Sequence, residues 1–364
     1  MPEHSYLSSP KSFQNTLLKW YGLNKRDLPW RHSSDPYVIW LSEIILQQTR
    51  VQQGLPYFAK FLNAYPDVHS FAAADEQDIL KHWQGLGYYS RARNMHKCAN
   101  EVVEYYGGQF PNSYDELLKL KGVGKYTAAA IASFAFQEPV AVLDGNVYRV
   151  LARIFGIEND IGESSSYKHF WSKAQELIST KDPGEFNQAL MEFGALHCVP
   201  KSPDCQQCVF QDVCVAQRND LQSVLPVKQK KIKKRTRYFN YFIISNGKKL
   251  LVNKRKKSDI WEGMYEFHLL ESKEAVELSE LEKGEAQELK KISSLVTCSD
   301  IYKHVLTHQT IFARFNHYEV VDESDFDFIK HAYELKEVSE DDFHTLPISR
   351  LTDKYLKKNL KHLT

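Results

Sequence analysis

The sequence contains little cysteine and no long apolar run. Only six of its 364 residues are cysteine, and no stretch of about eighteen apolar residues is present to span a membrane. The opening segment, MPEHSYLSSPKSFQNTLLKW, has no basic region followed by an apolar one, which predicts that no secretory signal peptide is present. We therefore expect a cytoplasmic protein without a membrane anchor, in a compartment where disulfides are rare.

The chain also lacks an excess of charge of either sign. Its 47 basic and 46 acidic residues give a net charge of +1, so no global positive field indicates a nucleic-acid partner. Positive charge is concentrated in VKQKKIKKRTR, residues 227–237, which holds seven basic residues and no acid. A solvated linker and a nucleic-acid contact are both open for this run. Pro226 precedes it and a strand-like segment follows it, which predicts a domain boundary over residues 217–237.

The two sides of this boundary differ in their apolar pattern. In residues 1–216 the apolar residues recur at helical spacing, as in PYVIWLSEIILQQ, AAADEQDILKHWQGL, YDELLKL and YTAAAIASFAF. Residues 238–364 contain strand-like runs, namely YFNYFIIS, KKLLVNKR and TIFARFNHYEV, with helical stretches such as SKEAVELSELEKG between them. The length allows two or three domains. We therefore expect a multidomain protein with an all-α part followed by an α+β part.

Four of the six cysteines lie in CVPKSPDCQQCVFQDVC, with six, two and five residues between them. They are Cys198, Cys205, Cys208 and Cys214. The expected compartment argues against a disulfide knot. Structural zinc sites usually pair two short knuckles and only one is present here, whereas four thiolates close in sequence can hold an iron–sulfur cubane. The spacing alone therefore favours a metal site and separates zinc from iron–sulfur only weakly. The other two cysteines, Cys98 and Cys298, are predicted to be small buried residues.

A glycine turn separates two predicted helices in LKGVGKYTAAAIASF. Gly122 and Gly124 allow positive φ and a close backbone approach, and the amides of the turn and of the next helix N-terminus can bind an anion. Lys125 lies beside them. This pattern is typical of a helix–hairpin–helix that binds a DNA phosphate, although a plain interhelical turn would have the same sequence features.

Together, the four-cysteine spacing and the Gly-Val-Gly turn resemble the signature of the endonuclease III superfamily of DNA glycosylases. The segment LPWR…PYVIWLSEIILQQTRV is similar to the one that defines the adenine-specific MutY family. The resemblance covers residues 15–220 strongly and 238–350 weakly. It implies three regions: a helical glycosylase domain at 1–216, a linker at 217–237 and a Nudix-like domain at 238–364. Within the glycosylase domain it implies a six-helix barrel at about 30–136, with a helix–hairpin–helix near 113–136. The rest of that domain, 1–29 and 137–216, is the expected iron–sulfur subdomain.

The resemblance also implies an activity and partners. The family hydrolyses the N-glycosidic bond of adenine opposite 8-oxoguanine or guanine in duplex DNA, with base flipping, and so initiates base excision repair. A thymine-mismatch or oxidised-pyrimidine glycosylase of the same superfamily, or a non-catalytic DNA-binding relative, stays open. We expect a [4Fe–4S] cluster on the four cysteines, and a monomer that acts on DNA in a bacterial cytoplasm, associated with the nucleoid. Replication or mismatch-repair factors are possible partners.

Two carboxylates are the candidate catalytic groups. Asp144, in LDGNVYRVLAR, is predicted to cap a helix, whose amides would keep its pKa low, and the resemblance implies that it stabilises the cationic sugar. Asn146 could orient it. Glu43 is the only acid of an apolar helix; burial would raise its pKa and suit a general acid, whereas an exposed position on that helix is equally compatible with the periodicity. The resemblance implies that Glu43 protonates adenine N7. Tyr126 stands where strand-cutting relatives have lysine and cannot form a Schiff base, which predicts a monofunctional enzyme.

The remaining candidate residues follow from the resemblance. Tyr88, in GLGYYSRARN, and Gln48 match residues that enter the duplex near the partner base. The expected pocket for the flipped adenine consists of Leu28, Trp30, Arg31, Val51, Tyr126 and Gln188. Phosphate contacts are expected at Gly122, Gly124 and Lys125.

The second half resembles the C-terminal domain of MutY in RKKSDIWEGMYEFHLLE. That domain is related in fold to Nudix hydrolases, but the sequence lacks the Nudix box G-x5-E-x7-R-E, so we expect recognition and not pyrophosphate hydrolysis. In KHVLTHQ, Leu306, Thr307 and His308 match the family's Phe-Ser-His loop that senses 8-oxoguanine. Thr307 keeps a hydroxyl group that can hydrogen-bond the lesion, whereas Leu306 lacks the aromatic ring.

Overall fold

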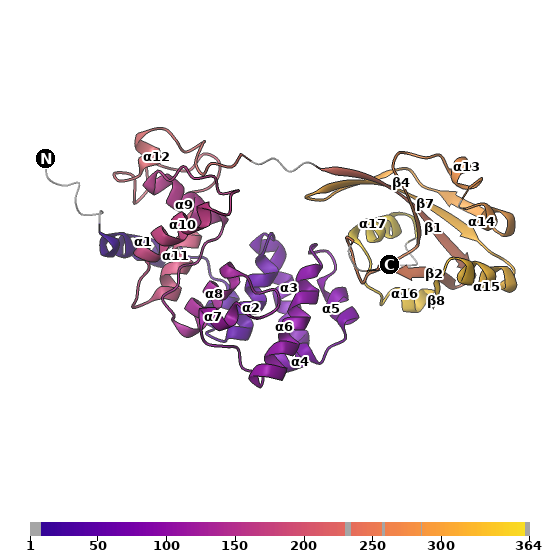
Figure 1. The fold of residues 1–364 in the computed structure, drawn as a ribbon, viewed down its shortest axis with the longest axis horizontal. Coiled ribbons are helices and arrows are strands. Elements are labelled where there is room, and N and C mark those ends of the chain that lie inside the picture. Colours follow the sequence, from indigo (N-terminus) through magenta and orange to yellow (C-terminus); the bar gives the residue numbers. More distant parts are fainter. Residues whose placement is uncertain (1–8, 230–233, 257–258, 285, 361–364) are drawn as a thin grey trace. The chain divides into compact units, whose positions relative to one another are not determined.

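The computed structural model describes residues 9–229, 234–256, 259–284 and 286–360 (Figure 1). The chain forms two compact units, one of Met1–Ala73 and Asn94–Lys230 and the other of Ala74–Arg93 and Lys231–Thr364. The second unit thus combines a short helical segment of the first half with the C-terminal half. Residues 230–233 of the basic run lie outside the described residues, and the interdomain linker stays a prediction.

The regular elements described in the first unit are all helices. They are α1 (Pro10–Asn24), a 3₁₀ helix (Pro29–His32), α2 (Pro36–Leu46), α3 (Val51–Ala64), α4 (Val68–Ala72), α6 (Ser90–Tyr106, whose first residues belong to the second unit), α7 (Tyr114–Leu117), α8 (Lys125–Phe136), α9 (Gly145–Phe155), α10 (Ser166–Leu177), α11 (Pro183–Leu196) and α12 (Val215–Arg218). Helix α5 (Glu76–Trp83) belongs to the second unit.

Two predicted helices are shorter than their apolar spacing suggests. AAADEQDILKHWQGL does not form one helix, because Asp75 accepts a hydrogen bond from the amide of Gln77 (2.6 Å) and starts α5 there. In YDELLKL only Tyr114–Leu117 is helical, and the chain then turns towards Gly122. Both cases show local turn chemistry prevailing over an apolar pattern.

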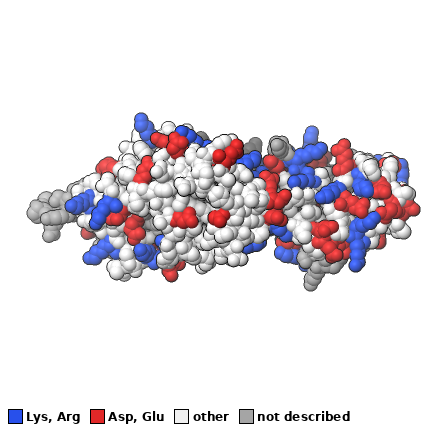
Figure 2. Space-filling view, turned by 90° about the horizontal axis from the view of Figure 1, so that it is seen from below, with Lys and Arg blue, Asp and Glu red and all other residues white. Residues whose placement is uncertain are grey.

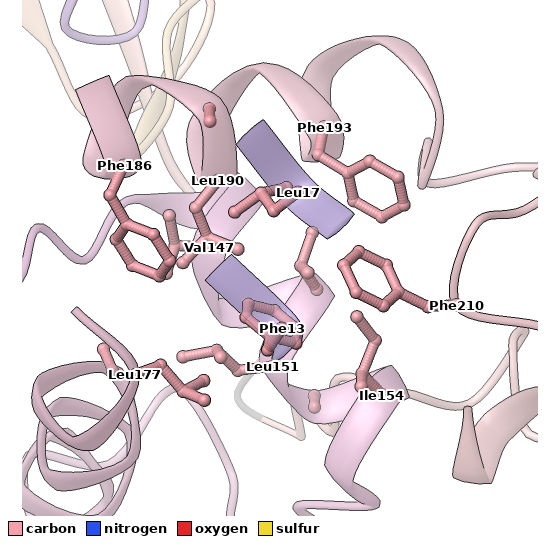
Figure 3. Packing of buried hydrophobic residues seen from close by; sticks show 14 of the residues in the cluster. Phe13, Leu17, Val147, Leu151, Ile154, Leu177, Phe186, Leu190, Phe193 and Phe210 are labelled. Carbon is pink, nitrogen blue, oxygen red and sulfur yellow. The ribbon is translucent and has the colours of Figure 1, made fainter. Parts of the chain in front are cut away.

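An aromatic core holds α1, α9, α10 and α11 together (Figure 3). Phe13 of α1 lies at its centre, and its ring stacks on that of Phe210 with a centroid separation of 4.7 Å. Phe193 of α11 packs edge-on against the same Phe210 ring at 5.3 Å. Fully burying each such ring stabilises the fold by roughly 1.5–3 kcal/mol. This core therefore fixes the start of α9 relative to α11, and both helices carry candidate site residues.

The second unit is built on a mixed sheet. Its strands are β1 (Arg235–Asn246), β2 (Lys249–Lys254), β3 (Tyr265–Glu266), β4 (His268–Ser272), β5 (Ser294–Cys298), β6 (Tyr302–Val305), β7 (Gln309–Glu319) and β8 (Lys336–Ser339). The order is β3-β2-β1-β7-β5, and β4, β6 and β8 pair with β1, β7 and β2. Strands β1 and β7 are parallel, with β1 paired from Arg235 to Ser245, whereas β2 and β4 pair with β1 antiparallel.

Helices cover both faces of this sheet. They are α13 (Leu278–Leu281), α14 (Gln287–Ile292), α15 (Glu323–Ala332), α16 (Glu340–Phe343) and α17 (Arg350–Asn359). On one face α14 and α15 pack on Phe242 and Tyr318, and on the other the ring of Tyr355 from α17 stacks on Phe315 at 4.0 Å. The predicted order of an all-α part followed by an α+β part is confirmed. Of SKEAVELSELEKG, however, only Leu278–Leu281 is helical.

The face in Figure 2 carries charges of both signs. Lys and Arg lie among Asp and Glu over parts of this face, and a large part of it carries neither sign. Among the described residues, no helix combines the length and the apolar character needed to cross a bilayer.

Candidate active site

A cavity of about 570 Å³ lies in the first unit between α2, α8, α11 and the start of α9. This volume is within the range of ligand sites, roughly 300–1,000 Å³. It brings together nine of the predicted site residues: Leu28, Trp30, Arg31, Glu43, Val51, Tyr126, Asp144, Asn146 and Gln188. Segments up to 160 residues apart thus supply one pocket, and these nine residues include two carboxylates, Glu43 and Asp144, and the guanidinium of Arg31.

Glu43 is buried on α2, with 5% of its surface exposed. The hydroxyl of Tyr126 donates a hydrogen bond to its carboxyl group. Burial is the main cause that raises the pKa of Glu43 to about 7; the negative charge of Asp144 raises it further, while the Tyr126 hydrogen bond and Arg31 lower it. The structure thus decides between the two positions left open by periodicity. A carboxyl group that is partly protonated near neutral pH can act as a general acid.

Asp144 caps α9 and is surrounded by donors. Its Oδ1 accepts hydrogen bonds from the amides of Asn146 (2.9 Å) and Val147 (2.7 Å), and its Oδ2 accepts one from the Asn146 side-chain amide (2.7 Å). The expectation that these amides keep the Asp144 pKa low is wrong. Burial raises this pKa by more than the hydrogen bonds lower it, because the carboxylate loses its water.

The side chain of Asn146 is itself held in one orientation. Its Oδ1 accepts a hydrogen bond from Arg149 Nη2 (2.8 Å), and the same nitrogen donates to the carbonyl of Gly194 (2.7 Å). The Nε of Arg149 donates to the carbonyl of Cys198 (2.8 Å). A chain of hydrogen bonds therefore runs from the Asp144 carboxylate to the first cysteine of the four-cysteine loop. Sequence analysis did not identify Arg149, which lies one helical turn after Asn146.

Glu192 and Arg26 are two further residues of the cavity that sequence analysis missed. The Glu192 carboxylate is paired with Arg26 (Nη2 to Oε2, 2.6 Å) and Arg31 (Nη2 to Oε2, 2.8 Å). Burial alone would raise the Glu192 pKa, but the hydrogen bonds from both arginines outweigh it and lower the pKa to about 2. A signal was present in the sequence: Glu192 is the single acid in ALMEFGAL, one turn after Gln188.

Gln188 presents its amide to the same cavity. The hydroxyl of Tyr21 donates a hydrogen bond to Gln188 Oε1 (3.2 Å). Burial is the main cause that raises the Tyr21 pKa to about 12, so this hydroxyl stays a donor at physiological pH. The Oε1 end of the amide is thus engaged, and the NH₂ end is available to a ligand with an acceptor atom.

Tyr88 and Gln48 lie outside this cavity and share an unusual backbone. Both have positive φ, 49° and 58°, which is uncommon for residues other than glycine, and both side chains are exposed. In the second unit the Tyr88 hydroxyl is hydrogen-bonded to Thr307 Oγ1. Tyr88, Thr307, Leu306, His308 and Trp261 contribute to a second cavity of about 410 Å³.

Of the two glycines in the turn, Gly122 has the positive φ that the sequence predicts, whereas Gly124 has a φ of −94°. Gly122 has a φ of 76°, and a Cβ atom there would lie 2.6 Å from the Cβ of Asn94, so no side chain fits. Gly124 is the N-cap of α8. The Nζ of Lys125 lies 4.1 Å from the ring centroid of Tyr167, a cation–π contact. The predicted phosphate contacts of these residues stay predictions.

All four cysteines of the loop line one small cavity. Arg153 binds this loop: its Nη1 lies 3.5 Å from Cys198 Sγ and donates to the carbonyl of Val199 (2.7 Å). Among the described residues, no group of three or more Cys, His, Asp and Glu is arranged to hold a metal ion. Cys98 is buried as predicted, whereas Cys298 is exposed, because it lies on the edge strand β5.

Comparisons with known proteins agree with this architecture. Residues 41–176 match the model of the HhH-GPD superfamily base excision DNA repair protein, and residues 240–358 match that of the NUDIX domain. The chain is 35% identical over 305 residues to the adenine DNA glycosylase of Buchnera aphidicola subsp. Baizongia pistaciae, covering 82% of this chain and 84% of the relative. To the adenine DNA glycosylase of Mus musculus it is 42% identical over 228 residues, covering 59% of this chain and 44% of the relative.

Among solved structures, a thermostable thymine-DNA glycosylase is similar to the first part of the chain. The TM-score is 0.55 at 32% sequence identity, over 59% of this chain and 99% of that one. Both the helical glycosylase fold and the Nudix-like fold of the second half are thereby confirmed, as is the resemblance found in the sequence. The chain belongs to the adenine DNA glycosylase family, hydrolases that act on N-glycosyl bonds in base excision DNA repair.

Proposed function

We propose that this chain releases adenine paired with 8-oxoguanine or guanine in duplex DNA, after flipping the adenine into the 570 Å³ cavity. The observation that carries the proposal is the pair of carboxylates in this one cavity. Glu43 faces a neutral hydroxyl donor and has its pKa raised to about 7, whereas Asp144 is surrounded by three N–H donors. Two carboxyl groups with different surroundings can act as the acid and the stabilising anion of a glycosidic cleavage.

In this proposal Glu43 donates its proton to N7 of the flipped adenine. The protonated base withdraws electrons from the bond between the sugar C1′ and N9, which breaks and leaves the electron pair on the adenine. The sugar becomes an oxocarbenium-like cation. The Tyr126 hydroxyl holds the Glu43 carboxyl group in place throughout.

Asp144 then stabilises the cation. Its carboxylate cannot turn away, because backbone amides and the Asn146 side chain hold both oxygens. A water molecule adds to C1′ and gives its proton to the Glu43 carboxylate, which restores the acid and leaves an abasic site. A fixed anion of this kind stabilises developing positive charge without reorganising.

Strand cleavage is not part of this proposal. The Tyr126 phenol cannot form an imine with the sugar. The neighbouring Lys125 lies over the ring of Tyr167 and is not among the residues that line the cavity.

The second unit would read the base opposite the adenine. Its 410 Å³ cavity contains Tyr88 and the segment Leu306–His308. The hydroxyl group of Thr307, hydrogen-bonded to Tyr88 here, could exchange that partner for 8-oxoguanine. Because Leu306 has no aromatic ring, recognition would depend on the hydroxyl group and on Tyr88.

We also propose that Cys198, Cys205, Cys208 and Cys214 hold a [4Fe–4S] cluster. The donor set fits, because four thiols line one cavity and Arg153 supplies a positive charge beside Cys198. The cluster would be structural and would order the loop that Arg149 and Arg153 attach to α9 through backbone carbonyls.

A single-turnover assay on three duplexes tests the function. The duplexes carry adenine opposite 8-oxoguanine, thymine opposite guanine, and an oxidised pyrimidine opposite guanine. We expect adenine release, with strand breaks only after alkali, and a loss of about 10²–10⁴-fold in rate for Glu43→Gln. Thymine release would instead favour a thymine glycosylase, the activity named for the solved structure that is 32% identical. A Glu43→Gln protein as fast as the wild type would contradict the acid assignment.

A further inference from the structure

Glu192 is a buried carboxylate that the proposed reaction does not use. Its side chain is 1% exposed. Three donors of Arg26 bind it, namely the backbone amide (2.9 Å), Nε (2.8 Å) and Nη2 (2.6 Å). Two nitrogens of Arg31 also bind it, Nη1 at 3.0 Å and Nη2 at 2.8 Å. A carboxylate with five N–H donors has one well-defined position.

The two arginines of this cluster differ in their surroundings. The Arg26 side chain is 36% exposed, so water screens its charge, whereas that of Arg31 is 14% exposed. The Nη1 of Arg31 also donates to the carbonyl of Arg26 (2.9 Å). Glu192 therefore compensates the charge of Arg31 and accepts two of the hydrogen bonds that orient it, together with the Arg26 carbonyl.

Arg31 also acts on the general acid. Glu43 faces Tyr126, Asp144 and Arg31, and Arg31 lowers the Glu43 pKa. Glu192 faces Arg26 and Arg31, and the neighbouring Tyr21 interacts with all three. If the Glu192 charge were absent, the Arg31 cation would act at full strength in a water-poor cavity. It would then hold Glu43 in the ionised form and repel a base that has taken up a proton.

We propose that Glu192 is a positioning residue that fixes Arg31 in the wall of the cavity and offsets its positive charge beside the acid Glu43. This inference rests on the proposed function, since it concerns the group that protonates the base. It assigns a role to a buried acid that does not exchange a proton in the proposed reaction.

Helix α11 offers a matched control. Glu185 lies two turns before Glu192 on the same helix and pairs with Lys25 (3.1 Å), but its side chain is 47% exposed. The substitutions Glu192→Gln and Glu185→Gln therefore remove the same charge from the same helix, at a buried and at an exposed ion pair. Only the first leaves the Arg31 charge unbalanced.

The pH profile of single-turnover adenine release distinguishes positioning from a purely structural role. We expect Glu192→Gln to move the alkaline limb to lower pH by about one pH unit, since an unbalanced cation in the wall of the same cavity favours the ionised form of Glu43. Glu185→Gln should retain the wild-type profile. A Glu192→Gln protein with the wild-type limb and only a lower melting temperature would overturn the proposal.

Two further variants keep the test decisive if Glu192→Gln does not fold. Glu192→Asp keeps the charge but shortens the side chain, so the limb should stay in place while the rate falls about ten- to a hundredfold through misplacement of Arg31. Wild-type kinetics for this variant would overturn the positioning role. In an Arg31→Gln background, Glu192→Gln should cause no additional change in the limb; an additional change would show that Glu192 acts without Arg31.

A substrate-free measurement separates this inference from the proposed function. The Glu43 carboxyl carbon can be titrated by NMR in the wild type and in Glu192→Gln. A lower Glu43 pKa in the variant supports the inference even if the wild type releases no adenine, and an unchanged pKa overturns it even if adenine is released.

Discussion

The two walls of the cavity each contain a carboxyl group, and the surroundings of these two groups differ. On the α2–α8 wall, Glu43 lies in an apolar helix and has one hydroxyl donor. On the α9–α11 wall, Asp144 has three N–H donors, and Asn146 behind it is held by Arg149. Burial raises both pKa values, that of Glu43 to about 7, and the hydrogen bonds from the surrounding N–H groups act against burial at Asp144. The two carboxyl groups thus share the effect of burial and differ in the donors that favour their charged forms.

Removing the negative charge of Asp144 should lower the rate strongly. In Asp144→Asn the side chain can still cap α9, because Asn is as good an N-cap as Asp. The negative charge that stabilises the sugar cation is lost, and we expect single-turnover adenine release to fall by about 10²–10³-fold. Circular dichroism should show an unchanged helix content. A decrease in rate of less than about threefold would mean that the Asp144 charge does not stabilise the sugar cation.

The burial of Glu43 should affect the stability of the fold as well as the rate of adenine release. Moving the Glu43 pKa from 4.5 to about 7 corresponds to about 3 kcal/mol. Between these pH values the native state binds more protons than the unfolded state, so the free energy of unfolding falls as the pH rises, and the loss is complete above about pH 7. We therefore expect Glu43→Gln to be more stable than the wild type at pH 8–9, with a smaller difference at pH 4–5. Denaturant unfolding at both pH values measures this; equal stability at pH 8–9 would contradict the raised pKa.

Part of this difference between Glu43 and Asp144 could be predicted from the sequence. The apolar run around Glu43 predicted the helix, but because α2 is apolar nearly all round, periodicity could not show which side of the helix is buried. The capping role of Asp144 was predictable from residue type and position. Its raised pKa was not, because burial depends on how α8 and α11 close over it. Glu192 carried the same signal as Glu43, a single acid among apolar residues, but its partners Arg26 and Arg31 lie more than 160 residues away.

The helices of the fold could also be predicted only in part. Apolar runs of helical length predicted α2 and α8, because both helices are buried over most of their surface. It missed the break before α5, where the side chain of Asp75 captures a backbone amide. Local hydrogen bonds of this kind depend on a single residue and contribute little to an apolar pattern.

Removing the Asn146 hydrogen-bond donor should make the surroundings of Asp144 more similar to those of Glu43. In Asn146→Ala, Asp144 Oδ2 loses its 2.7 Å hydrogen bond. Because that bond favours the charged form, its loss raises the Asp144 pKa further. We expect the rate near neutral pH to fall by about tenfold, as hydrogen bonds to charged groups contribute about 1.5–3 kcal/mol, and the acidic limb of the pH profile to move to higher pH. An acidic limb at the wild-type position would show that the backbone amides alone hold the Asp144 charge.

Removing the Tyr126 hydroxyl, which donates a hydrogen bond to Glu43, should have the smallest effect on the rate. In Tyr126→Phe the ring still lines the cavity, but Glu43 loses the hydrogen bond that lowers its pKa. The Glu43 pKa should rise, so the alkaline limb of the pH profile should move to higher pH, opposite to the direction expected for Glu192→Gln. We expect the maximal rate to change by less than about tenfold, because the proton donor is retained. An alkaline limb that moved to lower pH would mean that Tyr126 supports the protonated form, and the single hydroxyl of the α2–α8 wall would then have the opposite role to the N–H donors around Asp144.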